Sequence, residues 1–353
     1  MTGQLTTEAI SLLKTLIETK SFSSKEDKTA AIIEQWFIGH KLEYTRTNNN
    51  VWALNKHFDP SKPTLLLNSH HDTVQPNSAY TKDPFQAIVE DGKLFGLGSN
   101  DAGGCLVSLI ATFTYFYLKE NLNYNLVLVA SAEEESSGPN GLNSMLAIIP
   151  KVDVAIVGEP TLMQLAIAEK GLVVFDAKVK GKPSHAAHPN PDNAIYKCIE
   201  VLQWFKTYKF EKTSETLGEV KLTVSQIRAG KQHNAVPAEV DLVIDVRVND
   251  CYSNAEIAEM LKKESPCDSI VPRSLRLNSS SIPKAHPLVV EGIAMGRETY
   301  GSPTLSDQAV LTCASLKLGP GDSTRSHSAD EFIYLAEIEE GIALYIELLE
   351  RIL

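Results

Sequence analysis

Four short, uninterrupted apolar runs constrain the fold of this chain more than any other feature. They cover residues 51–54, 64–67, 126–130 and 154–157, and helical patterns separate them within the first 171 residues. A strand that is apolar at every position must be covered on both faces, and sheets of such strands are mostly parallel. We therefore predict an α/β domain with a mostly parallel sheet and helices on both faces.

The order of elements changes between residues 172 and 280. The patterns there predict, in turn, a strand, a helix, two strands, a helix and a strand, over residues 172–179, 193–205, 219–228, 239–248, 254–263 and 274–277. This βαββαβ order is typical of a ferredoxin-like unit. A helix-rich pattern returns after residue 281 and ends in a helix over 335–349. We therefore expect an inserted α+β domain at 172–280, flanked by the two parts of the first domain, 1–171 and 281–353.

Charge and cysteine usage argue against several classes of protein. Asp and Glu number 44 against 33 Lys and Arg, a formal net charge of −11, which disfavours nucleic-acid and anionic-membrane partners. The longest apolar stretch, residues 105–118, is interrupted by Ser and Thr and is shorter than the roughly 18 to 20 residues of a membrane span. The N-terminal residues lack a signal-peptide pattern, and the five cysteines show no paired spacing. We expect a buried helix at 105–118 and a cytoplasmic protein with reduced thiols.

Ligand-type side chains follow three of the apolar runs. His70 and Asp72 come directly after the second run, three consecutive glutamates, 133–135, after the third, and Glu159 after the fourth. In open α/β sheets the carboxyl ends of strands are where sites form. A His near an Asp can bind a metal through one ring nitrogen while the carboxylate holds the other, and adjacent carboxylates favour a nearby cation. Each feature alone has a structural alternative: a hydrogen-bonded loop at His70, or a solvated acidic run at 133–135.

Two glycine-containing loops add further candidates. Asp101 follows a glycine-rich segment, 96–98, and precedes the apolar helix, where it either belongs to a site or caps that helix. His327 lies in a turn-rich loop, 319–331. Two histidines with several carboxylates match a dinuclear zinc or cobalt site better than a calcium site, which prefers oxygen alone, or a zinc finger, which prefers thiolates.

With these residues, the whole chain resembles the zinc-dependent acyl-amino-acid hydrolases. This family includes acetylornithine deacetylase, succinyl-diaminopimelate desuccinylase and bacterial glutamate carboxypeptidases. The resemblance implies two zinc ions, or cobalt in their place, with His70, Asp101 and Glu159 on one ion. Asp101, Glu135 and His327 would hold the other, so that Asp101 bridges the two.

Two further carboxylates take roles from the resemblance. Asp72 would orient His70, and Glu134 falls at the position of the family's general base. The adjacent pair makes chemical sense, because Glu135 can hold a metal while Glu134 accepts the proton of an activated water and passes it to the leaving amine.

The resemblance also assigns residues of the insert, which is expected to act as a lid and as a homodimer interface. His185 corresponds to a histidine that reaches the partner subunit's site and stabilises the tetrahedral oxyanion, with His188 as a second candidate. Asn234 and Arg247 correspond to substrate contacts, with Arg247 pairing the substrate's α-carboxylate; an exposed charge on a sheet is the alternative for Arg247. His71 is expected at the surface or beside the ligands.

Arg325 lies two residues before His327 and matches no single subfamily. Beside the metals, it would favour an acyl group with its own carboxylate, such as succinyl, over plain acetyl. This assignment makes Arg325 a candidate substrate contact.

The favoured interpretation is hydrolysis of N-acetylornithine to ornithine and acetate, in arginine biosynthesis. The alternatives are desuccinylation of succinyl-ornithine or succinyl-diaminopimelate, cleavage of dipeptides or acyl-lysine, and a metal-binding or peptide-binding protein of this fold without catalysis. The presence of Glu134 and of all the ligand positions argues against the last alternative. A nucleotide-binding α/β protein would need a glycine-rich phosphate loop after the first strand, and the sequence has none there.

Overall fold

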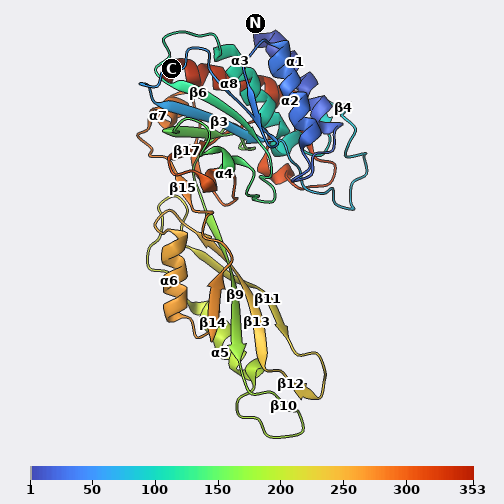
Figure 1. The fold of residues 1–353 in the computed structure, drawn as a ribbon, viewed down its shortest axis with the longest axis vertical. Helices are drawn as coiled ribbons and strands as arrows, with labels where there is room; N and C mark the ends of the chain where they lie inside the picture. Colours follow the sequence, from blue (N-terminus) through green and yellow to red (C-terminus); the bar gives the residue numbers. More distant parts are fainter. Residues whose placement is uncertain (1) are drawn as a thin grey trace. The chain divides into compact units, whose positions relative to one another are not determined.

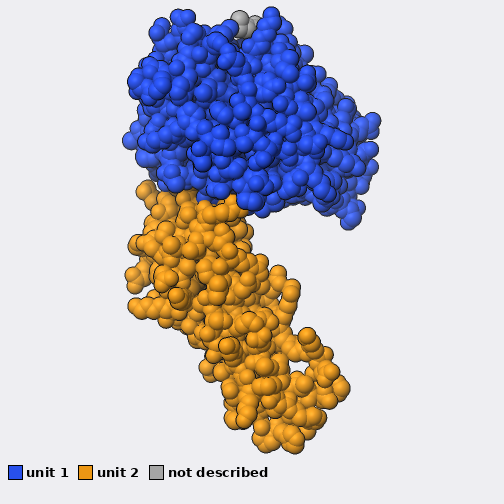
Figure 2. Space-filling view, viewed as in Figure 1, with its two compact units in different colours: residues 1–167, 281–300, 306–353 blue, residues 168–280, 301–305 orange. Residues whose placement is uncertain are grey.

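The computed structural model describes residues 2–353, which form two compact units (Figure 2). The first, here called the sheet unit, contains the chain up to residue 167 together with 281–300 and 306–353. The second, the inserted unit, contains residues 168–280 and also 301–305. Residues 301–305 therefore group with the inserted unit, whereas the sequence pattern placed all of 281–353 in the first domain.

Most of the elements labelled in Figure 1 belong to the sheet unit. The helices are α1 (Thr2–Ile17), α2 (Asp27–Gly39), α3 (Gly104–Phe116), α4 (Leu142–Met145), α7 (Pro287–Ala294) and α8 (Leu335–Ile352), with short helical turns η1 (Ser99–Gly103), η2 (Asp307–Val310) and η3 (Ser323–Arg325). The strands are β1 (Thr45–Thr47), β2 (Asn50–Leu54), β3 (Thr64–His70), β4 (Ile88–Glu90), β5 (Lys93–Phe95), β6 (Asn125–Ser131), β7 (Val154–Val157), β8 (Leu165–Glu169), β15 (Ser280–Ser281), β16 (Thr299–Ser302), β17 (Ala314–Lys317) and β18 (Phe332–Tyr334). Three of these strands, β8, β15 and β16, include residues of both units.

Within the described residues, the main sheet has nine strands in the order β1-β2-β6-β3-β7-β17-β8-β15, with β16 paired to β8. Its centre, β6-β3-β7-β17, is parallel, with Leu65 opposite Leu126 and Leu316 opposite Ile156. The run at 51–54 differs from the prediction, because β2 pairs antiparallel to β6. An apolar run shows that a strand is buried, but its direction depends on how the chain crosses from one strand to the next.

Alternate side chains of the central strands enter two different cores. Leu65 and Leu67 of β3 pack into the larger core with α1, α2, α3 and α8. Leu66 faces the opposite core with Leu142 and Met145 of α4. Figure 1 shows these helices on the two sides of the sheet, and α3, the expected buried helix, is apolar and buried along nearly its whole length. Burial on both faces is why these strands are apolar at every position.

The inserted unit is a separate α+β layer. Its elements are β9 (Gly171–Lys180), β10 (Ser184–His185), α5 (Ala194–Thr207), β11 (Lys221–Ala229), β12 (Ala235–Val236), β13 (Glu239–Val248), α6 (Asn254–Glu264) and β14 (Ser269–Pro272). The sheet order is β11-β13-β9-β14, antiparallel throughout, so the predicted ferredoxin-like unit is confirmed. Alternate residues of β9, such as Phe175 and Ala177, pack beneath α5 and α6. The helices begin at Asn193 and Ser253, whose side chains accept from backbone N–H groups of the first turn.

The last strand of the inserted unit was misplaced by sequence analysis. We expected it at 274–277, but β14 covers Ser269–Pro272. Ile270 is buried opposite Ala177 and supplies the apolar contact that holds this edge strand. Residues 274–277 alternate polar and apolar side chains as a half-buried strand would, and only the tertiary pairing of 269–272 with β9 shows that the strand lies earlier.

No helix among residues 2–353 combines the length and the apolar character that crossing a membrane requires.

Candidate metal centre

Three parallel strands bring candidate ligands to one edge of the main sheet. β3 ends at His70, β6 is followed by the glutamates 133–135, and β7 is followed by Glu159. Because β6, β3 and β7 are adjacent and parallel, their carboxyl ends lie side by side. The predicted convergence of these residues therefore follows from the strand order.

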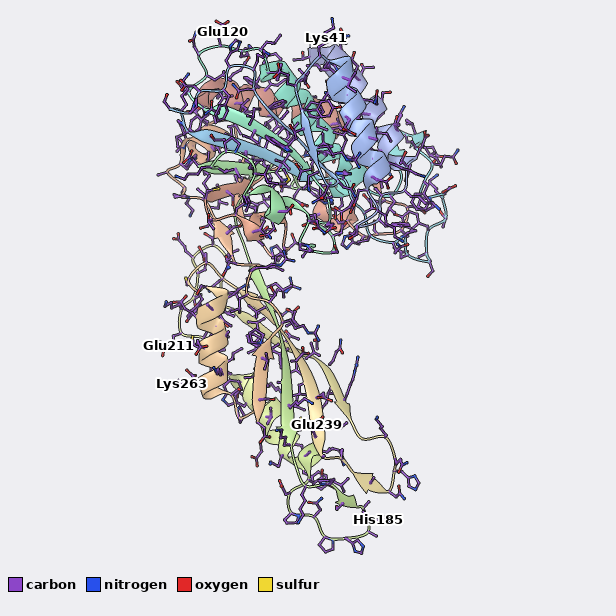
Figure 3. The ribbon with its side chains drawn as sticks, in the orientation of Figure 1. Lys41, Glu120, His185, Glu211, Glu239 and Lys263 are labelled. Atoms are coloured by element: carbon purple, nitrogen blue, oxygen red, sulfur yellow. The ribbon has the colours of Figure 1, made fainter. Side chains whose placement is uncertain are left out.

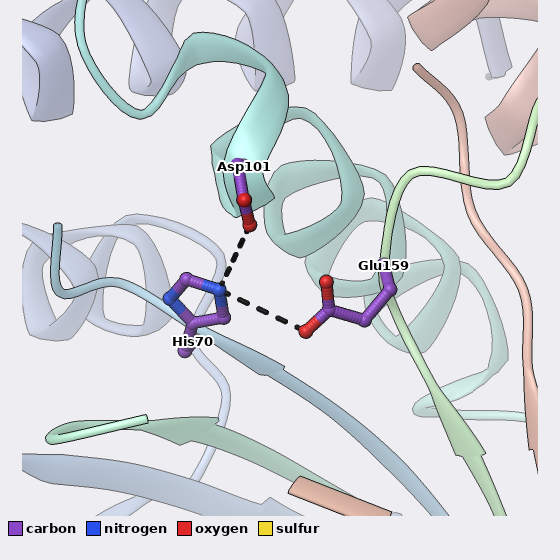
Figure 4. A group of neighbouring side chains, drawn as sticks. All are labelled: His70, Asp101 and Glu159. Atoms are coloured by element: carbon purple, nitrogen blue, oxygen red, sulfur yellow. Dashed lines mark ion pairs between the residues drawn. The ribbon is translucent and has the colours of Figure 1, made fainter. Parts of the chain in front are cut away.

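The first group of ligand atoms comes from His70, Asp101 and Glu159 (Figure 4). The imidazole of His70 is 1% exposed, and its Nε2 lies 3.4 Å from Asp101 Oδ1 and 3.8 Å from Glu159 Oε1. This buried Nε2 has no hydrogen-bond partner among the described residues. All three ligand atoms lie within 4.8 Å of one another, which suits a shared cation.

The second group consists of Asp101, Glu135 and His327. His327 Nε2 lies 3.6 Å from Asp101 Oδ2 and 3.0 Å from Glu135 Oε2. Asp101 thus directs one carboxylate oxygen towards each histidine. This is the arrangement expected of a carboxylate that bridges two metal ions.

The electrostatics of the cluster favour cations. Burial, reinforced by Asp101, raises the pKa of Glu159 to about 8, and burial also raises the pKa of Glu134 well above its usual value. Burial disfavours the charged form of His70, but the carboxylates of Asp101 and Asp72 outweigh this, so its pKa is raised well above the usual value. The hydrogen bond with Glu135 raises the pKa of His327 to about 9. Carboxylates that resist ionisation beside an unpartnered ring nitrogen fit two divalent ions with mixed nitrogen and oxygen ligands.

Asp72 organises the segment after β6. Its carboxylate accepts hydrogen bonds from the backbone N–H groups of Glu134 and Glu135 at 3.0 and 3.1 Å and from Ser23 Oγ at 2.6 Å. His70 Nδ1 is nearer to the backbone oxygen of Asp72, at 3.0 Å, than to its carboxylate, at 3.4 Å. Asp72 therefore contacts His70 and also holds the backbone of both glutamates.

The local backbone geometry points the side chains of the three consecutive glutamates in different directions. Glu133 has a φ of 57°, and its carboxylate turns inward to the backbone N–H of Asn140 at 3.0 Å and to Ser24 Oγ at 3.1 Å. Glu134 and Glu135 face the cluster instead. Glu134 Oε2 lies 3.9 Å from His70 Nε2, but Glu134 is in neither ligand group. Its position suits a proton acceptor that does not bind a metal.

The turn that carries Asp101 depends on Gly98, which has a φ of 76°. A Cβ at this position would also lie 2.6 Å from Thr73 Cγ2. Glycine is therefore required both for the conformation and for the space. The conformational requirement was expected from the sequence pattern, whereas the close approach of Thr73 was not.

Two residues that support the Asp101 turn, Glu331 and Asn100, were not among the candidates that the sequence patterns indicated. The buried carboxylate of Glu331 accepts from the backbone N–H groups of Gly98, Asn100 and Asp101. The side chain of Asn100 bonds to the backbone N–H and C=O of Asp322, both at 3.0 Å. The only signal in the sequence was their position beside candidate ligands, because backbone partners leave no residue pattern.

The candidate residues that the resemblance assigned to the insert all belong to the inserted unit. His185 lies at the end of this unit that β10 and β12 form, and it is exposed (Figure 3). His188 is nearby, with the two ring centroids 5.8 Å apart, and Asn234 is exposed in the loop before β12. Arg247 makes two hydrogen bonds to Asp245, at 2.9 and 3.1 Å, so a substrate carboxylate would compete with that pair.

Two other candidates have structural partners. Arg325 pairs with both carboxylate oxygens of Glu337, at 2.7 and 2.9 Å, and its guanidinium lies 4.8 Å from the ring centre of Phe332. His71 is buried rather than at the surface: Thr29 Oγ1 lies 2.9 Å from its Nδ1, and its Nε2 lies 2.9 Å from the backbone oxygen of Asn49. Burial lowers its pKa to about 4, so the imidazole is neutral. The neutral ring donates from Nε2 to Asn49 and accepts from Thr29.

Comparison with known proteins agrees with this geometry. Residues 66–351 match the model of peptidase family M20/M25/M40. A succinyl-diaminopimelate desuccinylase of Rickettsia felis is 26% identical over 72% of this chain and 72% of its own length. Another, of Wolbachia pipientis, is 25% identical over 98% of this chain and 93% of its own length.

Solved structures share the fold at lower identity. A dinuclear metal-binding peptidase of the M20 family from Bacillus subtilis has a TM-score of 0.75 at 14% identity, covering 99% of this chain and 100% of its own. An M20 family metallo-carboxypeptidase from Sulfolobus solfataricus has a TM-score of 0.74 at 16% identity, covering 98% and 99%. The predicted α/β fold, with its mostly parallel sheet, is thus confirmed. The chain belongs to peptidase family M20/M25/M40 and is a metal-dependent enzyme that hydrolyses amide bonds.

Proposed function

We propose that this enzyme cleaves the amide bond of an N-succinyl amino acid of the succinyl-diaminopimelate type, using two divalent ions. The observation that supports the dinuclear site is the placement of Asp101, whose two oxygens face His70 and His327 separately. In this proposal His70, Asp101 and Glu159 hold one ion, and Asp101, Glu135 and His327 hold the other. Zinc is the proposed native metal, with cobalt able to replace it.

When bound, two such ions polarise the scissile carbonyl and lower the pKa of water. Glu134 accepts a proton from the attacking water and passes it to the departing amine nitrogen. The backbone N–H of Glu134 is held by the Asp72 carboxylate, which restrains the position of the Glu134 side chain. Burial of His70, with Asp101 and Glu134 only 13% and 14% exposed, limits access of bulk water to this side of the cluster and strengthens the electrostatic interactions there.

The desuccinylase names of the Rickettsia and Wolbachia relatives favour succinyl over acetyl as the acyl group. This reverses the order that the sequence analysis preferred, in which acetylornithine came first. Arg325 does not support the choice, because its guanidinium is already paired with Glu337. N-acetylornithine hydrolysis and dipeptide cleavage are therefore alternative outcomes of the same experiment.

We further propose that residues of the insert complete the site across a homodimer. In this proposal His185 acts on the partner's substrate, Asn234 and Arg247 contact substrate, and residues 172–280 form the lid and the interface. Support comes from α5, where Ile195, Tyr196 and Ile199 are 43%, 69% and 63% exposed, and from β11, whose outer edge has no partner strand among the described residues. Exposed apolar patches and free strand edges are typical of association surfaces.

A substrate panel tests the proposed activity. Purified protein would be stripped with chelator, reloaded with Zn²⁺ or Co²⁺, and assayed with N-succinyl-diaminopimelate, N-acetylornithine and a dipeptide while metal content is measured. We expect two metals per chain and the highest kcat/KM on the succinyl substrate. Preference for either other substrate would refute the proposed acyl group. A protein that binds two metals but hydrolyses none of the three substrates would refute the proposed substrate class.

A further inference from the structure

Glu331 is a buried carboxylate with an unusual set of partners. Glu331 is only 1% exposed. No Lys, Arg or His of the described chain lies within ion-pair distance of its carboxylate. Instead, Oε2 accepts from the backbone N–H of Gly98 at 3.1 Å. Oε1 accepts from the N–H groups of Asn100 at 2.8 Å and Asp101 at 2.9 Å. The hydrogen-bond donors to the Glu331 carboxyl are therefore all backbone N–H groups, and burial raises the pKa of this carboxyl to about 8.

These N–H groups need an acceptor from outside their own segment. They lie at and just before η1, which leads into α3, and the first N–H groups of a helical segment have no partner within it. Water cannot serve them well, because Asn100 is fully buried and Asp101 is largely so. Glu331, which immediately precedes β18, supplies the acceptor, although it lies more than 200 residues after the turn in the sequence.

The contact reaches Asp101 directly. The backbone at Asp101 determines where its carboxylate points, and Glu331 binds the N–H of that residue. Glu331 also follows His327 by four residues, in the same loop. One loop thus presents His327 to the cluster and holds the turn that presents Asp101.

We propose that Glu331 is a positioning residue that sets the backbone of the Gly98–Asp101 turn, so that Asp101 can place one oxygen towards each of two metals. This inference rests on the proposed metal roles of Asp101 and His327. Glu331 touches neither metal-facing oxygen and is not a catalytic residue. Its effect should be visible in metal binding before any substrate is added.

Glu331→Gln is the direct test. The glutamine amide has the same shape but only one acceptor oxygen. If this oxygen accepts from Asn100 and Asp101, the NH₂ group faces the N–H of Gly98; if it accepts from Gly98, the NH₂ group faces the other two N–H groups. We expect this variant to bind Co²⁺ about 10- to 100-fold more weakly, at one site or both, in competition with a chromogenic chelator. The visible absorption spectrum of the Co²⁺-loaded protein should also change, which a purely structural role would not predict.

Two further variants make the result decisive. Asp330→Asn is a matched control, because this neighbouring, half-buried carboxylate accepts from the backbone N–H groups of Thr81 and Lys82 and from the Thr81 hydroxyl, without touching the Asp101 turn. It should retain parental affinity and spectrum. Glu331→Asp keeps a carboxyl group on a side chain one methylene shorter, and it should fold and show an altered Co²⁺ spectrum even if Glu331→Gln fails to fold.

The outcomes separate the two proposals. A parent protein that binds no metal would refute the proposed metal centre. A parent that binds two Co²⁺ ions, together with a folded Glu331 variant of identical affinity and spectrum, would refute the role of Glu331 alone. Equal losses in Asp330→Asn and Glu331→Gln would also refute it, because they would show a general effect of the loop.

Discussion

At the scale of single residues, the candidate centre depends on how adjacent side chains are separated. Glu133, Glu134 and Glu135 are chemically identical, yet the left-handed backbone at Glu133 sends its carboxylate to Asn140 and Ser24. Asp72 then holds the N–H groups of the other two. One glutamate becomes structural, while Glu135 lies beside His327 and Glu134 beside His70.

Glu134→Gln should keep both metals and lose turnover. The amide preserves size but cannot accept the proton from water, a role that typically contributes about 10²- to 10⁴-fold to the rate. Metal content and kcat measured on the same preparation check this. Glu135→Gln is the matched control and should lose metal as well as activity. Turnover by Glu134→Gln within a few-fold of the parent would show that another group is the base.

His71 predicts a pH dependence of stability. Its pKa is lowered to about 4 in the folded protein, against about 6.5 in the unfolded chain, so the unfolded chain binds the proton first. The stabilisation is complete above pH 6.5, is lost as the pH falls to about 4, and is constant below that. The difference corresponds to about 3 kcal/mol.

Urea unfolding of metal-free protein between pH 7 and 4 measures this effect. His71→Gln should be less stable than the parent at pH 7 and should lose less further stability on acidification. His57→Gln, at an exposed histidine, should follow the parent curve. If parent and His71→Gln lost equal stability over this range, the imidazole would not be neutral in the folded state.

At the scale of elements, the loop that carries His327 is attached to α8. Arg325, at the end of η3, forms a two-point ion pair with Glu337 in the first turn of α8, and the two side chains are only 16% and 18% exposed. Stacking against Phe332 and Tyr334 adds to this attachment. The geometry favours a structural role for Arg325 over recognition of the acyl group.

Arg325→Ala should therefore destabilise the protein by about 1–3 kcal/mol, since it leaves Glu337 without its charged partner. The ratio of kcat/KM for succinyl and acetyl substrates should stay unchanged. Denaturant unfolding and paired assays check the two parts, with Arg351→Ala as a control at a more exposed pair on the same helix. A selective loss of the succinyl substrate, with stability unchanged, would restore Arg325 as a substrate contact.

At the scale of the whole molecule, the chain builds two units that are buried in different ways. The sheet unit buries its strands on both faces and gathers ligand-type residues at one sheet edge. The inserted unit covers only one face of its sheet, with α5 and α6, and exposes apolar residues on α5. This asymmetry fits a unit that contacts another molecule.

A complementation experiment tests whether the enzyme works as a homodimer with His185 acting across it. His185→Ala and Glu134→Gln should each be nearly inactive alone. After mixing under conditions that exchange subunits, a hybrid dimer would have one site with both groups intact, so up to about a quarter of parental activity should return. No recovery from a mixture that light scattering shows to be dimeric and exchanged would exclude action in trans.

An interface variant provides the companion test. Ile199→Glu places a charge in the exposed apolar stripe of α5, and we expect a monomer by light scattering with its metal content unchanged. Because a monomer lacks the partner's His185, its turnover should fall to the level of His185→Ala. A monomeric variant with full activity would show that each chain has a complete site.

The sequence by itself determined the fold class and the residue types at the strand ends. Runs that are apolar at every position require burial on both faces, and the βαββαβ order of the insert follows from the alternation of strand and helix patterns. The same local patterns singled out His70, Asp101 and Glu159 as candidates, because ligand types interrupt apolar or glycine-rich segments there.

Only the tertiary structure decided the relations between distant segments. The antiparallel direction of β2, the choice of 269–272 over 274–277 for β14, and the burial of His71 all depend on partners far along the chain. The support of the Asp101 turn by Glu331 depends on backbone N–H groups, which every residue except proline carries and which therefore leave no trace in a sequence. The separate orientation of the two Asp101 oxygens is likewise a property of the packed chain, set by the turn that Glu331 holds.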